Sequence, residues 1–227
     1  GFKTTYITQE KAGKRSVTFK MAKVDLSGEA KKIGRRLAES LYMTQLMSFY
    51  RLFANGFSSA YTGADGKALF ADDHPIHAES ASGDTYSNLG TTAFSISGIT
   101  ATQTAMRRFV TYDGFPMQLK VDIVLIAPEL EPLAKQYFGG EAKLLPGTDY
   151  NDNNPVYDMK YVVIDGFTAK QWAAGDSFLM KEFIKMIVTT APMVMEQKSA
   201  NPLIAEYIGY MDYTMGWSEP KCIFGHD

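Results

Sequence analysis

The chain has 227 residues, of which 45% are apolar and 21% charged, and its 23 basic and 25 acidic side chains give a net charge of −2. Both fractions are typical of globular domains, and the length allows one large domain or two small ones. No apolar run approaches the ~20 residues that a membrane-spanning helix needs. The near-neutral charge argues against a dedicated nucleic-acid binder. A single cysteine, Cys222, excludes an intramolecular disulfide framework. Composition therefore predicts a soluble, globular protein of cytoplasmic origin.

Residues 3–25 have the pattern of a basic β-hairpin. The segment Thr4–Thr8 is rich in β-branched and aromatic residues, residues 11–14 include a glycine that suits a turn, and residues 16–21 alternate between polar and apolar. Five cations on this hairpin are candidate contacts to a neighbouring subunit: Lys11, Lys14, Arg15, Lys20 and Lys23. Because an isolated hairpin is marginally stable in water, we expect it to pack on the rest of the chain or on a neighbour.

Residues 28–54 predict a long amphipathic helix. One face carries apolar residues at four-residue spacing, namely Ile33, Leu37 and Leu41. Ser27 is a suitable N-cap, and Asn55 with Gly56 is expected to end the helix in the left-handed conformation. At 1.5 Å per residue the helix would be ~40 Å long, a length typical of a structural spine. Gly34 inside it marks either a bend or the close packing of a neighbouring element.

The remainder predicts a long irregular segment followed by an α/β region. Residues 57–95 are rich in Ser, Thr, Gly, Asp and Asn, with one short strand expected at 67–70. The later elements expected are a helix capped by Ser97, a strand over 117–126, a helix opening at Pro128, and strands over 157–164, 193–196 and 207–213. The apolar stretch 178–188 fits strand or helix equally well, and Pro192 is expected to interrupt it.

Carboxylates and imidazoles crowd together at one place in the sequence, where a zinc or manganese ion would find suitable ligands: Asp72, Asp73, His74 and His77. The competing interpretation is a turn in which an aspartate caps the backbone and His74 bonds it ahead of Pro75. Neither a nucleophile elbow nor a phosphate-binding loop occurs, and Cys222 fits a small buried hydrophobe. We therefore expect no catalytic residue, no cofactor and no metal, with a small metal-dependent hydrolase as an alternative.

The order of expected elements, together with several short motifs, resembles the major capsid proteins of tailed bacteriophages. The motifs are the run DGKALFADDHP at 65–75, TYSNL at 85–89, Asn-Asn-Pro at 153–155 and Gly-Trp at 216–217. These motifs are most similar to those of the Mu-like major head subunit family. The resemblance spans nearly the whole chain, and the 65–75 region is its most distinctive part.

The resemblance implies an α+β fold of the HK-ninety-seven type, also called the Johnson fold. Its parts would be an extended β-hairpin loop, a peripheral domain that contains the spine helix, an inserted α/β axial domain, and a return to the peripheral domain. In this sequence they would occupy residues 1–26, 27–96, 97–191 and 192–227 respectively.

The resemblance also implies a structural role in place of an enzymatic one. Copies of the chain would form hexamers and pentamers of an icosahedral shell, assembled in the bacterial host cytoplasm, that encloses phage double-stranded DNA with weak, non-specific contact. Scaffold, portal and decoration proteins would be further partners, and no membrane would be. The alternative with the same fold is an encapsulin-like shell protein of a bacterial nanocompartment.

Overall fold

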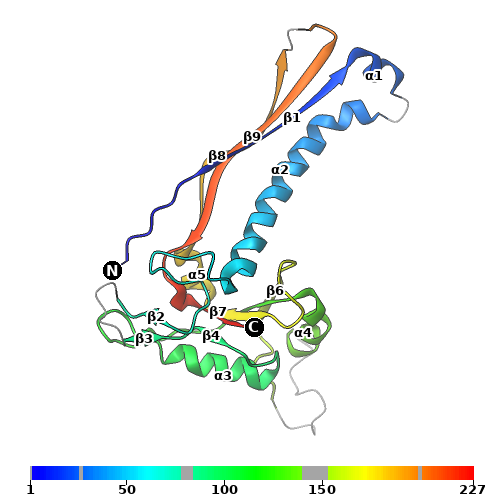
Figure 1. Ribbon diagram of the computed structural model, residues 1–227. Helices are drawn as coiled ribbons and strands as arrows, with labels where there is room; N and C mark the ends of the chain where they lie inside the picture. Colours follow the sequence, from blue (N-terminus) through cyan, green and yellow to red (C-terminus); the bar gives the residue numbers. More distant parts are fainter. Residues whose placement is uncertain (1, 26–27, 78–83, 140–152, 199–200) are drawn as a thin grey trace. The chain divides into compact units, whose positions relative to one another are not determined.

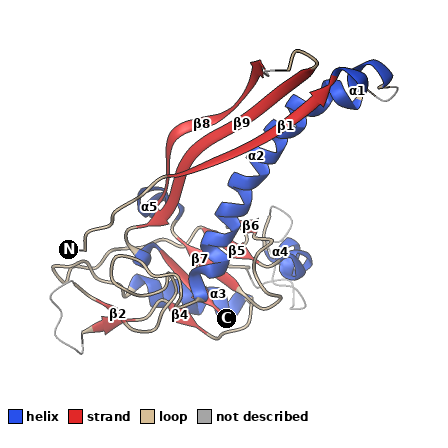
Figure 2. Ribbon diagram, turned by 45° about the horizontal axis from the view of Figure 1, so that its top comes forward, coloured by secondary structure: helices blue, strands red, loops and turns tan. Residues whose placement is uncertain are grey.

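The computed structural model describes all residues except 1, 26–27, 78–83, 140–152 and 199–200 (Figure 1). The chain is a mixed α+β protein that divides into two compact units. One unit comprises Tyr6–Phe49 and Met186–Met215, and we call it the sheet–helix unit. The other comprises Gly1–Thr5, Tyr50–Lys185 and Gly216–Asp227, and we call it the mixed unit. Figure 2 shows helices and strands in both. Among the described residues, no helix is long and apolar enough to cross a membrane.

A three-stranded sheet dominates the sheet–helix unit. Its strands follow the order β1-β9-β8, with β1 at Gln9–Thr18, β9 at Ile204–Trp217 and β8 at Ile184–Lys198. Strands β1 and β9 are antiparallel, with Gly13 opposite Gly209. The two edge strands are therefore β1 and β8. The strands expected at 193–196 and 207–213 are confirmed as parts of β8 and β9.

The expected hairpin at 3–25 is wrong. Residues 11–14 lie inside one continuous strand, and Phe19–Val24 forms the short helix α1, which Thr18 caps by accepting a hydrogen bond from Met21 N. A Cβ on Gly13 would make an ordinary contact with Leu37 Cδ1 at 3.5 Å. Pairing of β1 with β9, which lies almost two hundred residues later in the sequence, thus takes the place of the expected local turn.

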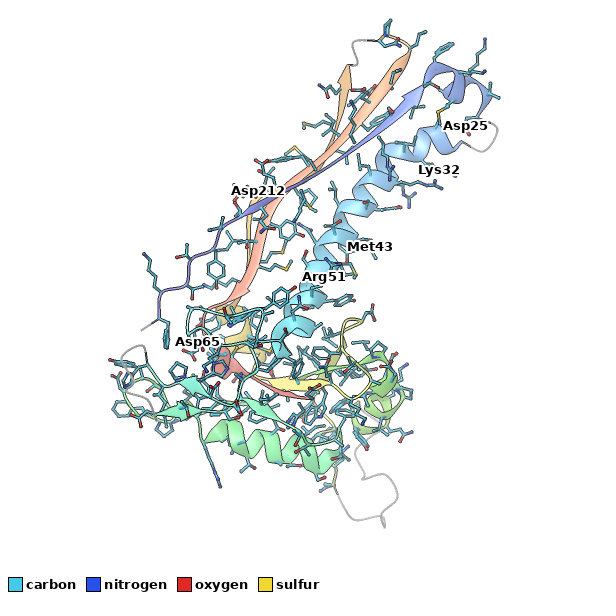
Figure 3. The ribbon with its side chains drawn as sticks, in the orientation of Figure 1. Asp25, Lys32, Met43, Arg51, Asp65 and Asp212 are labelled. Carbon is cyan, nitrogen blue, oxygen red and sulfur yellow. The ribbon has the colours of Figure 1, made fainter. Side chains whose placement is uncertain are left out.

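The long helix is confirmed as α2, Glu29–Ala54. Ala30 N donates to Asp25 Oδ2 at 2.6 Å near its start, where Figure 3 labels Asp25. The proposed cap Ser27 lies outside the described residues. At the other end the left-handed stop is wrong, because a 3₁₀ turn over Asn55–Phe57 follows directly. Gly56 is needed there for space, since a Cβ would lie 3.1 Å from Leu69 and Phe70.

Helix α2 packs on β9 at very close range. A Cβ on Gly209 would lie 3.0 Å from Leu37 Cγ and 3.1 Å from Leu41 Cδ1, which is too close for most side chains. At Gly34 a Cβ would meet the Tyr207 ring at 3.7 Å, an ordinary contact distance, so the expected neighbour is present there but does not require a glycine. Leu41 is buried in one apolar cluster with residues of β9, namely Met211 and Tyr213. The absent side chain of Gly209 thus lets the helix cover the middle strand.

A five-stranded mixed sheet organises the mixed unit. Its order is β4-β10-β7-β5-β6, with strands at Leu89–Gly90, Ile223–His226, Trp172–Gly175, Ile123–Ile126 and Lys160–Val163. Pairs β10·β4 and β5·β6 are parallel, whereas β7 is antiparallel to both its neighbours. Its buried core joins Ile99 and Met106 of helix α3 (Ile96–Arg107) to Val124 and Trp172 of the sheet. The strands β2 (His74–Pro75) and β3 (Thr85–Tyr86) form a separate pair.

Several element boundaries differ from expectation. Ser95, not Ser97, caps α3, because its backbone is extended and its hydroxyl accepts from Gly98 N. Residues 67–70 form no strand, and of the strands expected at 117–126 and 157–164 only 123–126 and 160–163 pair. The Pro128 start is confirmed by a 3₁₀ turn, Pro128–Leu130, that leads into α4, Glu131–Tyr137.

The ambiguous stretch 178–188 is helix and strand in turn. Helix α5 (Ser177–Phe183) passes directly into β8, and β8 continues through Pro192. The expected interruption at Pro192 is wrong because β8 is an edge strand, where a residue without an N–H costs the sheet no internal hydrogen bond. The division of the chain into extended loop, peripheral and axial domains stays a prediction, since it concerns roles in an assembly.

His226 of β10 is buried in its neutral form. Its Nδ1 accepts from Thr92 N at 3.3 Å, and its Nε2 lies 2.8 Å from Thr102 Oγ1, whose own hydroxyl donates to Gly98 O. The ring stacks on Trp172 with centroids 4.1 Å apart. A second ring proton, on Nδ1, would point at the Thr92 N–H and displace its hydrogen bond. Burial lowers the pKa of His226 from 6.5 to about 4.

We expect acid to destabilise the mixed unit through His226. The unfolded chain takes up a proton near pH 6.5 and the folded chain only near pH 4, so this contribution is fully present above pH 6.5 and is lost as pH falls towards 4. The free energy of unfolding should drop by about 3 kcal/mol at most across that window. Urea unfolding at several pH values checks this. His226→Gln should flatten the slope, and an unchanged slope would contradict the assignment.

Candidate functional site

The five cations proposed as inter-subunit contacts do not surround a hairpin turn. Three lie on β1 and two on α1, so they belong to one edge strand and the short helix that follows it. Because strand side chains alternate, Lys11 and Arg15 lie on the face of β1 that carries Gly13, and Lys14 on the other. Lys20 and Lys23 are exposed on α1. The five cations, which are close in the sequence, therefore lie in one region of the structure but not on one surface.

Their contacts within the chain also differ. Lys14 Nζ lies 2.8 Å from Glu206 Oε2 on β9, and Lys11 Nζ donates to Gln9 Oε1 at 3.2 Å. Arg15 lines a shallow groove with Leu37 and Ser40 of α2. Lys20 and Lys23 have no ion-pair partner in the part of the chain that the structure describes. Arg15 and these two lysines are thus exposed cations without an ion-pair partner among the described residues, and their role at a contact stays a prediction.

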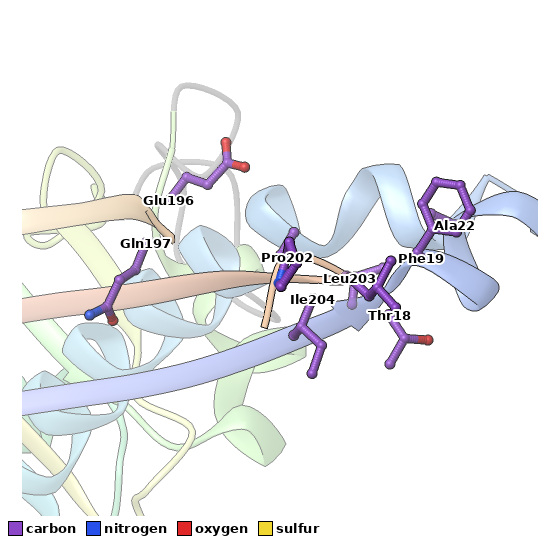
Figure 4. Close-up of a pocket in the computed structure, with 10 residues that line it drawn as sticks. Thr18, Phe19, Ala22, Glu196, Gln197, Pro202, Leu203 and Ile204 are labelled. Carbon is purple, nitrogen blue, oxygen red and sulfur yellow. The ribbon is translucent and has the colours of Figure 1, made fainter. Parts of the chain in front are cut away.

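Helix α1 also exposes apolar side chains. Phe19, Met21 and Val24 are all largely solvent-accessible. A cavity of about 400 Å³ opens beside α1, lined by residues of β1, α1, β8 and the start of β9 (Figure 4). Phe19 and Leu203 lie on its wall, and Phe19 N donates to Leu203 O at 2.7 Å. Exposed apolar and aromatic groups with polar residues around them are typical of a protein–protein contact surface.

The histidine–aspartate cluster is not a metal centre. Among the described residues, no three His, Cys, Asp or Glu side chains gather as metal ligands. His74 is fully buried, with Nδ1 2.6 Å from Asp65 Oδ2 and Nε2 3.1 Å from Asn88 Oδ1. Asp73 pairs with Lys67, and the His77 ring packs edge-on against Tyr112. The hydrolase alternative therefore loses its centre, and the backbone-turn interpretation is also wrong, because His74 bonds side chains.

Asn88 is the centre of a buried hydrogen-bond network that the sequence interpretation missed. Its Oδ1 accepts from Ala71 N at 3.0 Å, and its Nδ2 lies 2.8–3.2 Å from three carbonyl oxygens, those of Leu69, Pro220 and Ile223. This arrangement fixes the amide orientation, so Nε2 of His74 donates to Oδ1. The network joins the irregular segment 57–95 to the last residues of the chain. The TYSNL motif at 85–89 thus has a structural role.

Tyr86 and Lys221 pack against the same network. Tyr86 stacks on His74 with ring centroids 5.1 Å apart, and Lys221 Nζ lies 4.9 Å from the Tyr86 centroid. The Tyr86 hydroxyl donates to Glu219 Oε1 at 3.4 Å. Burial, with Glu219 nearby, raises the pKa of Tyr86, so it stays protonated. The distinctive sequence region therefore builds a buried hydrogen-bond network within the mixed unit.

The comparisons with known proteins reveal a shared fold and no close relative. No protein-family model matches the sequence, and no curated protein does. A chain of Mycobacterium phage Patience matches with TM-score 0.63 and 6% identity, covering 99% of this chain and 71% of that one. The mature capsid of bacteriophage PhiM1 matches with TM-score 0.58 and 11% identity, covering 98% and 71%. The SrpI encapsulin of Synechococcus elongatus matches with TM-score 0.56 and 8% identity, covering 98% and 74%.

These matches extend over nearly the full chain, although the identities are low. The chain therefore has the fold that phage capsid chains and encapsulins share. This confirms the mixed α+β capsid-like fold expected from the sequence. The narrower similarity to Mu-like head subunits stays a prediction.

We expect Asn88→Ala to destabilise the chain strongly. The substitution leaves several buried carbonyl groups and the Ala71 N–H without their partner, and each unsatisfied group costs roughly 1–3 kcal/mol. The free energy of unfolding should fall by about 3 kcal/mol or more. Chemical denaturation measures it. The matched control is Asn153→Ala, at an exposed asparagine, which should change it little. Equal effects at both positions would refute the role of Asn88.

Proposed function

We propose that the chain is a structural shell subunit of a bacteriophage capsid, which assembles with copies of itself around double-stranded DNA. The observation that carries this proposal is the likeness to the capsid of bacteriophage PhiM1 over 98% of the chain. The contact-type surface on α1 supports it, because a subunit that works by repeated weak contacts needs such surfaces. The role is structural and requires no catalytic group.

The finer parts of the proposal are drawn from the motifs. The DGKALFADDHP and TYSNL runs favour a relation to Mu-like major head subunits. In that relation residues 1–26 form the extended loop that lies over a neighbour, residues 27–96 and 192–227 the peripheral domain, and residues 97–191 the axial domain. Hexamers and pentamers would then be the rings of the shell. Its partners would include scaffold, portal and decoration proteins, and its place would be the virion.

A second candidate, the shell of a bacterial nanocompartment, is favoured by the likeness to the SrpI encapsulin. Electron microscopy of the purified chain at high concentration tests both, because each predicts closed particles of uniform size. The contents of the purified particles then separate them. Packaged nucleic acid supports the capsid, whereas a single co-purifying cargo protein supports the nanocompartment. Failure to form any particle would contradict both candidates.

We expect charge reversal on α1 to impair assembly without unfolding the subunit. The double variant Lys20→Glu, Lys23→Glu replaces two exposed cations with carboxylates. These carboxylates should repel an acidic neighbour and lower the yield of sedimenting particles by at least about tenfold. The control is Lys170→Glu, at an exposed lysine of the mixed unit. Thermal melting should be unchanged in all variants. Normal particle yield from the double variant would show that Lys20 and Lys23 take no part in the contact.

A further inference from the structure

The two edges of the three-stranded sheet are built in opposite ways. Each edge strand presents a row of backbone N–H and C=O groups along its outer side, and within the described residues no further strand pairs with either row. Soluble proteins protect such rows, most often with charged side chains, because an open row invites another strand. We therefore compare the charged side chains along the two edges, because the edge with fewer of them is the better candidate for pairing with another strand.

Strand β1 is protected. Four of its ten residues are charged: Glu10, Lys11, Lys14 and Arg15. Of these, Glu10, Lys14 and Arg15 are exposed and Lys11 is partly exposed. A second strand could join this edge only by bringing its own groups against that charge.

Strand β8 has one residue of the kind that blunts an edge, Pro192, and no charge over its middle. Between Lys185 and Glu196 lie ten consecutive uncharged residues, MIVTTAPMVM. Five large apolar side chains of this run are 38–48% exposed, namely Met186, Ile187, Val188, Met193 and Met195. Because side chains alternate along a strand, they lie on both faces of the sheet. A long, exposed, apolar edge is an aggregation site unless a partner covers it.

We propose that the outer edge of β8 pairs antiparallel with β8 of a second copy of this chain, across a two-fold axis. This inference rests on the proposed self-assembly and names one of its contacts. The second copy is the occupant that fits because the run is uncharged, apolar on both faces and self-complementary. A chain that assembles with itself supplies one such strand for every strand to be covered, and closed two-fold contacts are the commonest between identical subunits.

Pro192 fixes which backbone groups point outward. Proline occurs within sheets where its missing N–H faces away from the neighbouring strand. Its N therefore faces the outer side of β8, and so do the N–H and C=O groups of the other even-numbered residues. A two-fold axis requires one residue to lie opposite its own copy, and we place it at an outward-pointing residue, which forms a hydrogen-bonded pair with its copy. Thr190 is the even-numbered residue at the middle of the uncharged run.

This register places apolar side chains opposite one another. With Thr190 opposite itself, Met186 faces Val194, Val188 faces Pro192, and Ile187 faces Met193. Lys185 and Glu196 lie opposite Met195 and Ile184, so no charged side chain faces a like charge. One inter-strand hydrogen bond is lost at each Pro192. The pairing gives four of the five exposed apolar side chains, Met186, Ile187, Val188 and Met193, an apolar or proline neighbour across the new edge.

A cysteine at the two-fold axis tests the register directly. Directly opposed Cα atoms in such a pair are about 5.5 Å apart, which is within disulfide range. Cys222, the one native cysteine, is fully buried, and burial raises its pKa to about 12, so it gives no background. Under mild oxidation of the full chain in assembly conditions, Thr190→Cys should shift from the monomer to twice the monomer mass on a non-reducing gel. The matched control Ser16→Cys, exposed on the other edge strand, should stay monomeric.

A second variant guards against effects on folding. Thr190→Lys sets two like charges directly opposite one another and should abolish the contact, while its thermal melting stays that of the wild type. Particles that form without a Thr190→Cys dimer would overturn the proposed strand pairing and leave the shell function standing. A specific Thr190→Cys dimer without particles would support the pairing and contradict the shell function. Equal cross-linking at Ser16→Cys would also overturn the proposal.

Discussion

The close approach of α2 to β9 is the constraint on which the sheet–helix unit depends. Gly209 has no side chain, and Leu37 and Leu41 occupy the space that a Cβ would need. Gly13 lies opposite Gly209 on the neighbouring strand, where Leu37 again approaches. The helix can therefore lie directly on the central strand and bury Met211 and Tyr213. One helix is enough to cover the middle of the sheet, but it leaves the outer strand β8 exposed.

The apolar side chains that β8 and α1 leave exposed bear on the function of the chain. Strand β1 carries charge along its edge, whereas β8 has only Pro192 as a residue of the kind that blunts an edge. Here β8 exposes methionines, isoleucine and valine, and α1 exposes Phe19, Met21 and Val24. The Asn88 network, in contrast, satisfies its buried polar groups within the chain. The motif region therefore satisfies its polar groups within one copy, whereas the three-stranded sheet leaves apolar side chains and a strand edge exposed. That division is what a shell subunit requires, because its interior must be stable before its copies meet.

The sequence predicted those parts of the fold that depend on local patterns. The four-residue spacing of Ile33, Leu37 and Leu41 sufficed for α2, because a helix's hydrogen bonds and its apolar face are both local. The hairpin failed because a glycine among lysines has the same local pattern in a turn as in a strand packed under a helix. Gly13 lies opposite Gly209 of β9, a partner that no local pattern reveals. Pro192 failed as a breaker because edge position is a property of the whole sheet.

The candidate site was less predictable than the fold. The aspartates and histidines at 72–77 have the composition of a metal site, but the partners of His74 are Asp65 and Asn88, which lie outside that run. A single asparagine in an irregular segment has no periodic signal, so Asn88 could be found only through the motif that contains it. The five cations were identified together by their density in the sequence. The structure distributes them over two faces of a strand and a helix, because alternation in β1 separates neighbours.

The central claim is that folding of one copy leaves the β8 edge open and that assembly covers it. Hydrogen–deuterium exchange of the isolated subunit and of the assembled state measures this at the backbone. We expect the amides of the even-numbered residues between Ile184 and Glu196, Pro192 excepted, to exchange rapidly in the subunit and to be protected after assembly. Central-strand amides of β9 should be slow in both states. Protection of the β8 edge already present in the isolated subunit, or none gained on assembly, would contradict the account.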